Sequence, residues 1–384
     1  MEFYNSDTIN LNAGTVSATP KIVLEKLTEY QKSFENNPSA QWFYIWEKLW
    51  AAQKHLAQFI NANPQDLFLR PNVTYACNDF ILGIKLGPGS LAVTSLEYGA
   101  VANIVKLRAH KERRRFDVIN LSEKPKSIES MLEEVLSQLK ADTRLLLLSH
   151  VFTGNGLRFP IEKLALETKK RGIILAVDGA HGPGLLGLDF KSLQDVDFYG
   201  GNLHKWMMGP KGTGFGWVNP QRQDELDSIQ GGWTTFETPF IFEPFAPGHR
   251  FAQKMLMAST VNFSSYLAIK DIVDWWQEQG TEKVRQRIAH LNQKARLWAE
   301  NELSLELAYP TLNDQAPFGA YYLPEAILKK TNNVIFDIFE KTKVTVNCPM
   351  TNGRPTIRFT VGYWMEESVV DEGLVRIKKY LASY

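Results

Sequence analysis

The chain reads Ile173-Ile174-Leu175-Ala176-Val177-Asp178-Gly179-Ala180-His181, an apolar run that ends abruptly in a carboxylate. Such a run without polar alternation is typical of a strand buried on both faces of a parallel sheet. Asp178 would then stand at the carboxyl end of the strand, where a poorly solvated carboxylate needs a partner. Asp-Gly is also an ordinary turn signal, so this run alone leaves a turn or a helix cap open.

Short apolar runs of this kind alternate along the chain with amphipathic helical stretches, such as 127–139 and 161–170. The alternation predicts an α/β protein whose parallel sheet is covered by helices on both faces. In such sheets the functional groups collect beyond the carboxyl ends of the strands. We expect seven strands, at 67–69, 91–94, 118–121, 145–149, 173–177, 198–199 and 214–218.

The pattern changes near Ala268, where a long charged helix over 271–301 is followed by mixed α+β sequence. The length of 384 residues is enough for two or three domains. We predict a large domain over 21–267 and a smaller α+β domain over 268–384. The N-terminal segment 1–20 is expected to pack on the small domain or on the functional site.

Composition excludes several classes of function. With 43 Lys+Arg against 42 Asp+Glu, the chain lacks the cationic surplus of a general nucleic-acid binder. We interpret its one basic run, His110-Lys111-Glu112-Arg113-Arg114-Arg115, as a solvated helix end before a strand at 116–121. No apolar stretch approaches the roughly 18 residues of a membrane span. Two cysteines and the absence of a signal-peptide pattern predict a cytoplasmic protein.

Two further strand ends carry chemistry. Lys205 lies among glycine, aromatic and methionine residues in Gly200-Gly201-Asn202-Leu203-His204-Lys205-Trp206-Met207. Desolvation there would lower the pKa of its amine and make Schiff-base chemistry feasible, although an exposed loop lysine is the ordinary alternative. The run Leu69-Arg70-Pro71-Asn72-Val73-Thr74 leads into a helix whose first N–H groups suit a phosphate or merely need a cap. A lysine, a carboxylate and a phosphate cup are together what pyridoxal phosphate (PLP) requires.

With these motifs the chain resembles the class V aminotransferases of the fold-type I PLP-dependent enzymes. The likeness is greatest to isopenicillin N epimerase-like proteins and more distant to cysteine desulfurases. It runs from Leu11-Asn12-Ala13-Gly14-Thr15 to Ile357-Arg358-Phe359-Thr360, and the ordered pair Asp178-Gly179-Ala180-His181 and Asn202-Leu203-His204-Lys205-Trp206 is its most specific part. The resemblance implies a large domain with a mainly parallel seven-stranded sheet flanked by helices, plus a smaller α+β C-terminal domain.

The resemblance also implies catalytic roles for four residues. Lys205 would form the Schiff base with PLP and move the substrate α-proton. Asp178 would keep the pyridine nitrogen of the cofactor protonated, and His181 would bond its phenolic oxygen. Tyr98 falls where the family has an aromatic ring stacked on the cofactor, with a buried core aromatic as the other interpretation.

Further positions match the binding residues of the family. Arg358 would hold the substrate carboxylate through a bidentate fork, together with Asn12, unless it forms a structural ion pair instead. Thr260 would reach the phosphate bound by a partner subunit, or else cap a helix. The remaining cofactor-binding positions are Val73 through its backbone, Thr74, Asn202 and His204 at the phosphate, and Thr153 near the ring oxygen.

The implied activity is that of an enzyme acting on an amino acid, a small-molecule substrate, through an external aldimine and α-proton abstraction. An epimerase or racemase like isopenicillin N epimerase is favoured, ahead of a cysteine or cystine C–S lyase or an aminotransferase. A cysteine desulfurase is disfavoured, because Cys348 directly follows a β-branched strand close before Arg358, and Cys77 falls in a helix. The alternative from another class is a catalytically silent PLP-fold binding protein.

The expected partners follow from the same resemblance. A homodimer with shared active sites is implied, and neither a nucleic-acid nor a membrane partner is expected. No metal is expected either, since the seven histidines lack the spacing of metal ligands.

Overall fold

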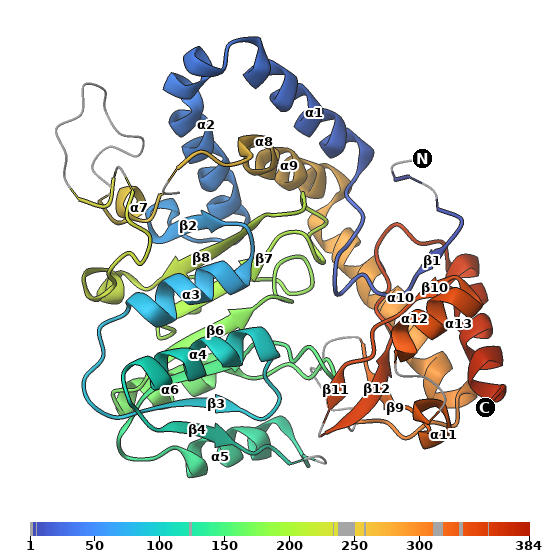
Figure 1. Cartoon of the computed structure of the whole chain (residues 1–384). Helices are drawn as coiled ribbons and strands as arrows, with labels where there is room; N and C mark the ends of the chain where they lie inside the picture. The colour runs from blue at the N-terminus through green and yellow to red at the C-terminus, as the bar shows by residue number, and fades with distance from the viewer. Residues whose placement is uncertain are drawn as a thin grey trace.

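The fold is described from a computed structural model (Figure 1). It describes residues 3–4, 6–122, 125–232, 234–236, 250–256, 259–309, 318–329, 333–351 and 353–384. At its centre lies a seven-stranded sheet in the order β2-β8-β7-β6-β5-β3-β4. Only β8 is antiparallel to its neighbours, so the expected mainly parallel sheet is confirmed. The strands are β2 (Leu67–Arg70), β3 (Ser90–Thr94), β4 (Phe116–Ile119), β5 (Thr143–Ser149), β6 (Ile174–Gly179), β7 (Phe198–Asn202) and β8 (Gly214–Val218).

Strand β5 explains why the central apolar runs show no polar alternation. Successive side chains point to opposite faces of a sheet. Leu146 and Leu148 enter a core with helices α2 (Pro38–Phe59) and α6 (Ile161–Lys170), whereas Leu145 and Leu147 enter a second core. Helices α3 (Val73–Gly83) and α4 (Gly99–Lys111) build that second core and lie side by side on one face of the sheet (Figure 1).

The edge strand β4 begins at Phe116, as the strand expected after the basic run does, although the apolar run alone indicated 118–121. It pairs with β3 from Phe116 to Ile119, and Asn120 and Leu121 have already left the sheet. Val118 is largely exposed, as the edge position allows. The apolar pattern was therefore a poor guide to the start of this strand.

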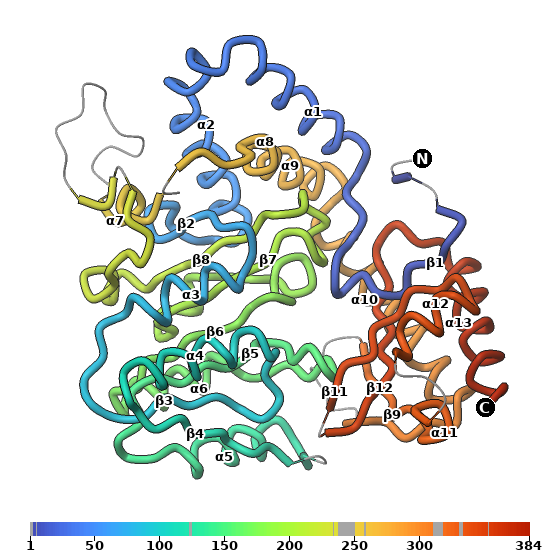
Figure 2. Tube along the Cα trace, viewed as in Figure 1, coloured from blue at the N-terminus to red at the C-terminus, as the bar shows by residue number. Residues whose placement is uncertain are grey.

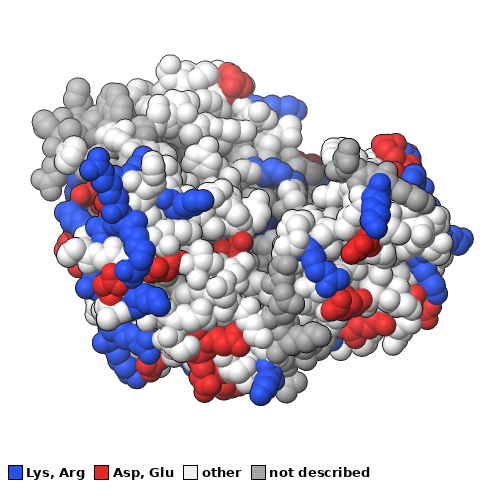
Figure 3. All heavy atoms as spheres, turned by 60° about the horizontal axis from the view of Figure 1, so that its bottom comes forward, with Lys and Arg blue, Asp and Glu red and all other residues white. Residues whose placement is uncertain are grey.

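The basic run ends helix α4, which confirms its interpretation as a solvated helix end. Arg115 pairs with Asp142 at 2.6 Å and with Asp117 at 2.9 Å, and Arg114 pairs with Glu112. Blue and red side chains are intermixed on the face drawn in Figure 3. No helix among the described residues has the length and apolarity to cross a membrane.

The predicted long helix over 271–301 is in fact two helices, α9 (Ile269–Gln279) and α10 (Thr281–Glu302). Gly280 separates them with a φ of +83°, a left-handed conformation that favours glycine. The first turns of α10 pack in the core of the large sheet through Val284 and Ile288. Its later turns enter a third core with α13 (Glu367–Ala382).

The third core joins the two ends of the chain (Figure 2). Strand β1 (Ile9–Asn10) lies parallel to β10 (Val344–Thr345), and Leu11 is fully buried there. Beside it, β12 (Arg354–Arg358) is the middle strand of a three-stranded antiparallel sheet. The elements not yet given are α1 (Lys21–Asn36), α5 (Ile128–Gln138), α7 (Arg250–Lys254), α8 (Phe263–Leu267), α11 (Glu325–Leu328), α12 (Val334–Thr342), β9 (Ala320–Tyr322) and β11 (Met350–Thr351).

Candidate active site

The carboxyl ends of β6 and β7 form the centre of the candidate site. The two strands are parallel neighbours, with Asp178 opposite Gly200 and Gly179 opposite Gly201. Their register places the segment after β6, which carries His181, beside the segment after β7, which carries Lys205. The lysine and the carboxylate singled out in the sequence thus belong to one site.

Asp178 is buried, with 3% of its surface exposed. Its Oδ1 accepts a hydrogen bond from the Ala180 N–H at 2.8 Å, and the carboxylate has no other hydrogen bond or ion pair among the described residues. Burial raises the pKa of Asp178, while the Ala180 N–H and the Lys205 charge act in the opposite direction. A buried carboxylate with one oxygen free can receive a cationic N–H.

Lys205 faces His181, with 3.3 Å between Nζ and Nε2. Burial lowers the pKa of the amine to about 8; Asp178 raises it and the Arg358 charge lowers it. No carboxylate forms a salt bridge with this amine among the described residues. The neutral, nucleophilic form of Lys205 is therefore far more populated near neutral pH than that of an exposed lysine.

His181 connects the lysine with two further segments. Its Nε2 lies 3.1 Å from Thr153 Oγ1, and its Nδ1 accepts the indole N–H of Trp206 at 3.0 Å. Burial, together with the charges of Lys205 and Arg358, lowers the pKa of His181 well below its ordinary value. The ring is therefore neutral.

The start of α3 and the end of β7 come together as expected. Asn202 Oδ1 accepts the Val73 N–H at 2.8 Å, so this backbone donor is occupied by protein. Neither the Thr74 N–H nor its hydroxyl has a partner among the described residues, and both lie in the first turn of α3. His204 donates through Nδ1 to the Thr213 carbonyl at 3.1 Å, and burial lowers its pKa to about 4. In this neutral form its Nε2 can only accept a hydrogen bond.

Arg358 is fully buried and has no carboxylate partner in the described part of the chain. Its Nη1 donates to the Thr153 carbonyl at 2.7 Å, and its Nη2 donates to Asn12 Oδ1 at 3.2 Å and Thr15 Oγ1 at 3.4 Å. Its Nε has no partner. Burial lowers the pKa of the guanidinium to about 10. A structural ion pair does not account for this residue.

Tyr98 is 51% exposed, so it is not the core aromatic that the sequence left open. It lines a cavity of about 420 Å³ together with Thr153, which also contacts His181. Thr260 is exposed, and Asn262 is the residue at the start of α8, so Thr260 does not cap that helix. No hydrogen bond joins Thr260 to the other site residues within the described part of the chain.

Sequence reasoning missed Glu97, which lines the same cavity as Tyr98. Its carboxylate accepts hydrogen bonds from Thr94 Oγ1 at 2.6 Å and Ser149 Oγ at 2.5 Å. Burial is the main cause that raises its pKa to about 8. The available signal was an acidic residue directly after a buried strand and before Tyr98.

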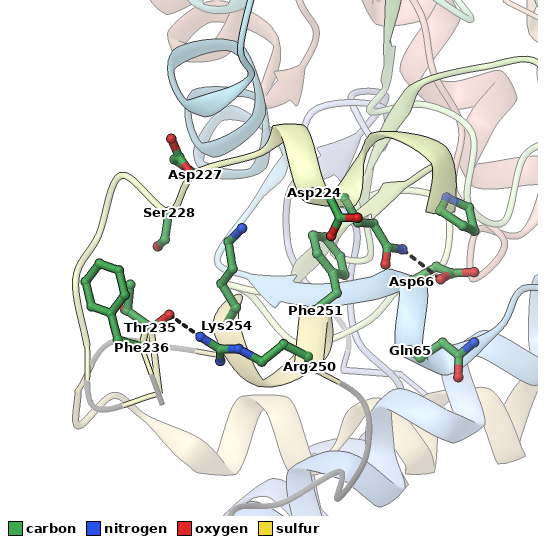
Figure 4. Close-up of a pocket in the computed structure, with 12 residues that line it drawn as sticks. Gln65, Asp66, Asp224, Asp227, Ser228, Thr235, Phe236, Arg250, Phe251 and Lys254 are labelled. Carbon is green, nitrogen blue, oxygen red and sulfur yellow. Dashed lines mark hydrogen bonds between the residues drawn. The ribbon is translucent and has the colours of Figure 1, made fainter. Parts of the chain in front are cut away.

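A larger cavity, about 670 Å³, lies at the opposite end of the sheet (Figure 4). Asp66 before β2 and Asp224 after β8 line it, together with Arg250 and Lys254. It shares no lining residue with the candidate site. Within the described residues, no three His, Cys, Asp or Glu side chains are grouped as metal ligands.

A family model, Aminotransferase class-V, matches residues 8–312. The chain belongs to this family. Class-V aminotransferases are PLP-dependent enzymes, so the lysine and the carboxylate described above lie in an enzyme of that kind. The chain is 27% identical to isopenicillin N epimerase of Streptomyces clavuligerus over 373 residues, which is 94% of this chain and 92% of the relative. It is 28% identical to an L-cysteine desulfhydrase-like protein of Epichloe uncinata over 57% of this chain and 50% of the relative.

Solved structures of the same fold confirm the fold-type I architecture expected of a class-V aminotransferase. The cystine C–S lyase C-DES in complex with cysteine persulfide matches with a TM-score of 0.83 and 21% identity, over 97% of this chain and 98% of that chain. A cysteine desulfurase from Thermococcus onnurineus matches with a TM-score of 0.80 and 18% identity, over 98% of this chain and 96% of that chain.

Proposed function

We propose that the protein binds PLP at the carboxyl ends of β6 and β7 and uses it to act on the α-carbon of an amino acid. The residues fit the cofactor: Asp178 has a free oxygen, Lys205 is an amine of lowered pKa, and Thr74 has unpartnered donors at a helix start. Bound PLP withdraws electrons from the α-carbon of an amino-acid substrate and so makes its α-proton acidic.

Four residues would hold the cofactor ring. The Asp178 carboxylate keeps a proton on the pyridine nitrogen, because its buried charge is stabilised by an N–H partner. His181 and Thr153, which contact each other, would bond the phenolic oxygen, and Tyr98, which lines the same cavity as Thr153, would stack on the ring.

The phosphate would lie at the start of α3. Thr74 offers an N–H and a hydroxyl there, and the positive end of the helix dipole favours an anion. Asn202 orients this turn through the Val73 N–H. His204 can donate to the phosphate only when its Nε2 is protonated, so binding through His204 requires uptake of a proton.

Substrate recognition rests on the observation that carries the proposal, the fully buried Arg358 without a carboxylate partner. A buried cation of this kind needs an anion, and a planar guanidinium matches a carboxylate. Asn12 uses its oxygen on Arg358, which leaves its amide N–H groups for the same carboxylate. Lys205 Nζ, a base when neutral, can then accept the α-proton.

For the overall reaction we propose amino-acid epimerisation or racemisation. Support comes from the similarity to isopenicillin N epimerase, which extends over 94% of the chain. A C–S lyase is the second candidate, because an L-cysteine desulfhydrase-like protein and the cystine lyase C-DES are also similar.

A cysteine desulfurase remains disfavoured. Burial raises the pKa of the Cys348 thiol to about 12 and that of Cys77 well above its ordinary value, and a thiol is a poor nucleophile. A silent binding protein is disfavoured because Lys205 and Asp178 are both intact. We further propose a cytoplasmic homodimer, in which the exposed Thr260 reaches the phosphate of the partner subunit.

Borohydride reduction of the PLP-loaded protein, followed by peptide mass spectrometry, tests the cofactor site. We expect the label on Lys205 and its loss in Lys205→Ala. Lys211→Ala is the matched control, because burial also lowers the pKa of that amine to about 8 while its Nζ bonds Ser17 and Thr19. A label that persists in Lys205→Ala contradicts the proposal.

An amino-acid panel in deuterated water then separates the reactions. Deuterium incorporation with loss of optical purity identifies an epimerase or racemase. Pyruvate and sulfide released from cysteine identify a lyase, and a product that depends on an added keto acid identifies an aminotransferase. Cofactor labelling without turnover of any amino acid would identify a binding protein.

A further inference from the structure

The indole of Trp206 contacts Nδ1 of His181, whereas Lys205 faces the other ring nitrogen, Nε2. Trp206 is buried and stacks on Phe318, with 5.7 Å between the ring centroids and 23° between the planes. From this position its Nε1–H points to His181 Nδ1 at 3.0 Å. An indole nitrogen can only donate, so Nδ1 of His181 must be the acceptor.

A neutral imidazole carries one ring proton. Because Nδ1 accepts, that proton is on Nε2, the nitrogen 3.1 Å from Thr153 Oγ1 and 3.3 Å from Lys205 Nζ. We propose that Trp206 is a positioning residue, which fixes His181 as an Nε2–H donor toward Lys205 and toward the oxygen of the bound cofactor. This inference deepens the proposed function and rests on it only where the cofactor oxygen is concerned.

The tautomer has a consequence for the lysine. An ammonium has donors only, so the Nε2–H of His181 disfavours the charged form of Lys205 and favours the neutral amine. The other charged groups facing Lys205 are Asp178, which favours the ammonium, and Arg358, which disfavours it. Without the indole N–H, His181 could move its proton to Nδ1 and accept from the ammonium through Nε2.

Long-range proton–nitrogen NMR of the full-length, PLP-loaded protein with ¹⁵N-labelled histidine reads the tautomer directly. The signal of His181 is assigned by its absence in His181→Gln. We expect a protonated Nε2 and an unprotonated Nδ1 in the wild type. A protonated Nδ1 overturns the proposal, and this measurement needs no Trp206 variant to fold.

Trp206→Phe removes the indole N–H and keeps an aromatic ring against Phe318. We expect the Nε2–H pattern to be lost, and the pH midpoint for the rate of PLP uptake by the cofactor-free variant to rise by about one unit, since a hydrogen bond to a charged group is worth that much. Trp276→Phe is the matched control, because it removes another buried indole N–H, bonded to the Met207 carbonyl at 2.8 Å.

Two outcomes separate the positioning role from a packing role. In a His181→Gln background, which has no tautomers, Trp206→Phe should leave the pH midpoint unchanged. An equal shift in that background, or an equal shift in Trp276→Phe, contradicts the positioning role. If the wild type takes up no PLP, the proposed function is wrong, while the same NMR measurement on the cofactor-free, full-length protein still decides the tautomer.

Discussion

At the scale of single residues, the surroundings of Arg358 differ from those of a structural ion pair. A buried charge without an opposite charge costs folding free energy, and proteins retain it where a ligand supplies the missing charge. Among the described residues Arg358 donates hydrogen bonds only to a carbonyl and two uncharged side-chain oxygens, and its guanidinium lies over the ring of Phe318. This arrangement supports the proposal that Arg358 binds the carboxylate of the substrate.

We predict that Arg358→Lys raises the KM for the amino-acid substrate by about 100-fold, because a point charge replaces a bidentate fork. PLP binding should change little. Steady-state kinetics and PLP titration measure the two effects. Arg354→Lys is the control, since Arg354 lies on the same strand but is exposed and pairs with Glu306. Unchanged KM in Arg358→Lys contradicts the assigned role.

Glu97 gives a prediction for pH dependence. Its pKa rises from an ordinary value of 4.5 to about 8 on folding, so the folded state binds a proton that the unfolded state releases between these values. Its contribution to stability is complete below pH 4.5 and is lost as the pH rises through 8. Glu97→Gln removes this loss.

We therefore compare the free energy of unfolding of Glu97→Gln with that of the wild type. The variant's advantage should be about 2 kcal/mol greater at pH 9 than at pH 5, allowing for partial exposure of the side chain. Urea unfolding at both pH values measures the difference. Glu133 is an exposed glutamate on α5, so the free energy of unfolding of Glu133→Gln relative to the wild type should be the same at both pH values. If the free energies of unfolding of Glu97→Gln and the wild type differ by the same amount at pH 5 and pH 9, Glu97 does not titrate as expected.

The sequence was sufficient for those site residues whose position follows from the strands. Asp178 and Lys205 meet because two apolar runs become parallel neighbours, whose ends lie at one edge. The sequence was insufficient to predict hydrogen-bond partners that depend on the orientation of a side chain. The Val73 N–H bonds Asn202 rather than remaining free, and neutral His204 presents an acceptor. Nothing in the residue pattern encodes these orientations.

At the scale of elements, the segment over residues 11–19 ties the strand of Arg358 to the loop of Lys205. The Gly14 N–H donates to Thr360 Oγ1 at 2.9 Å, and the Ser17 N–H donates to the His204 carbonyl at 3.0 Å. Lys211 also holds this segment, because its Nζ donates to the Ser17 carbonyl at 2.6 Å. Asn12 and Thr15, both of which contact Arg358, belong to this segment.

We predict that Lys211→Met loosens the segment and raises the rate of proteolysis within residues 1–20 about tenfold, because a lost bond of about 1.4 kcal/mol changes local opening by that factor. Timed proteolysis with mass spectrometry measures it. Lys26→Met, which removes an exposed pair with Glu29 on α1, is the control. Equal cleavage rates in the two variants would mean that Lys211 does not hold the segment.

Predictions for the elements succeeded where apolar runs are buried on both faces, as in β5 and β6. They failed where burial is weak or one residue interrupts the pattern. The exposed edge strand β4 begins earlier than its apolar residues indicated, and Gly280 divides a helix that periodicity alone continued. A single left-handed residue breaks a helix without altering the residue pattern on either side of it.

At the scale of the whole molecule, the proposed homodimer assigns Thr260 to the site of the partner subunit. We predict that Thr260→Asp lowers the affinity for PLP at least tenfold, because a carboxylate beside a phosphate is repulsive. Equilibrium dialysis measures the affinity. Ser259→Asp, at the neighbouring exposed position, is the control.

Mixed dimers test the same arrangement. A subunit with Lys205→Ala retains Thr260, and a subunit with Thr260→Asp retains Lys205. A dimer of the two would therefore contain one intact site, at the Lys205 of the Thr260→Asp subunit. PLP affinity should therefore return in co-expressed heterodimers that carry separate affinity tags. If the heterodimers bind PLP no better than the Thr260→Asp homodimer, Thr260 does not act across subunits.

The parallel pairing of β1 with β10 has a consequence for biosynthesis. Ile9 pairs with Val344, which is synthesised about 335 residues later. At about 5–20 residues per second, the interval between them is roughly 20 to 70 seconds. During that interval the apolar Ile9 and Leu11 have no strand to join, so the nascent chain is exposed to premature association at these two residues.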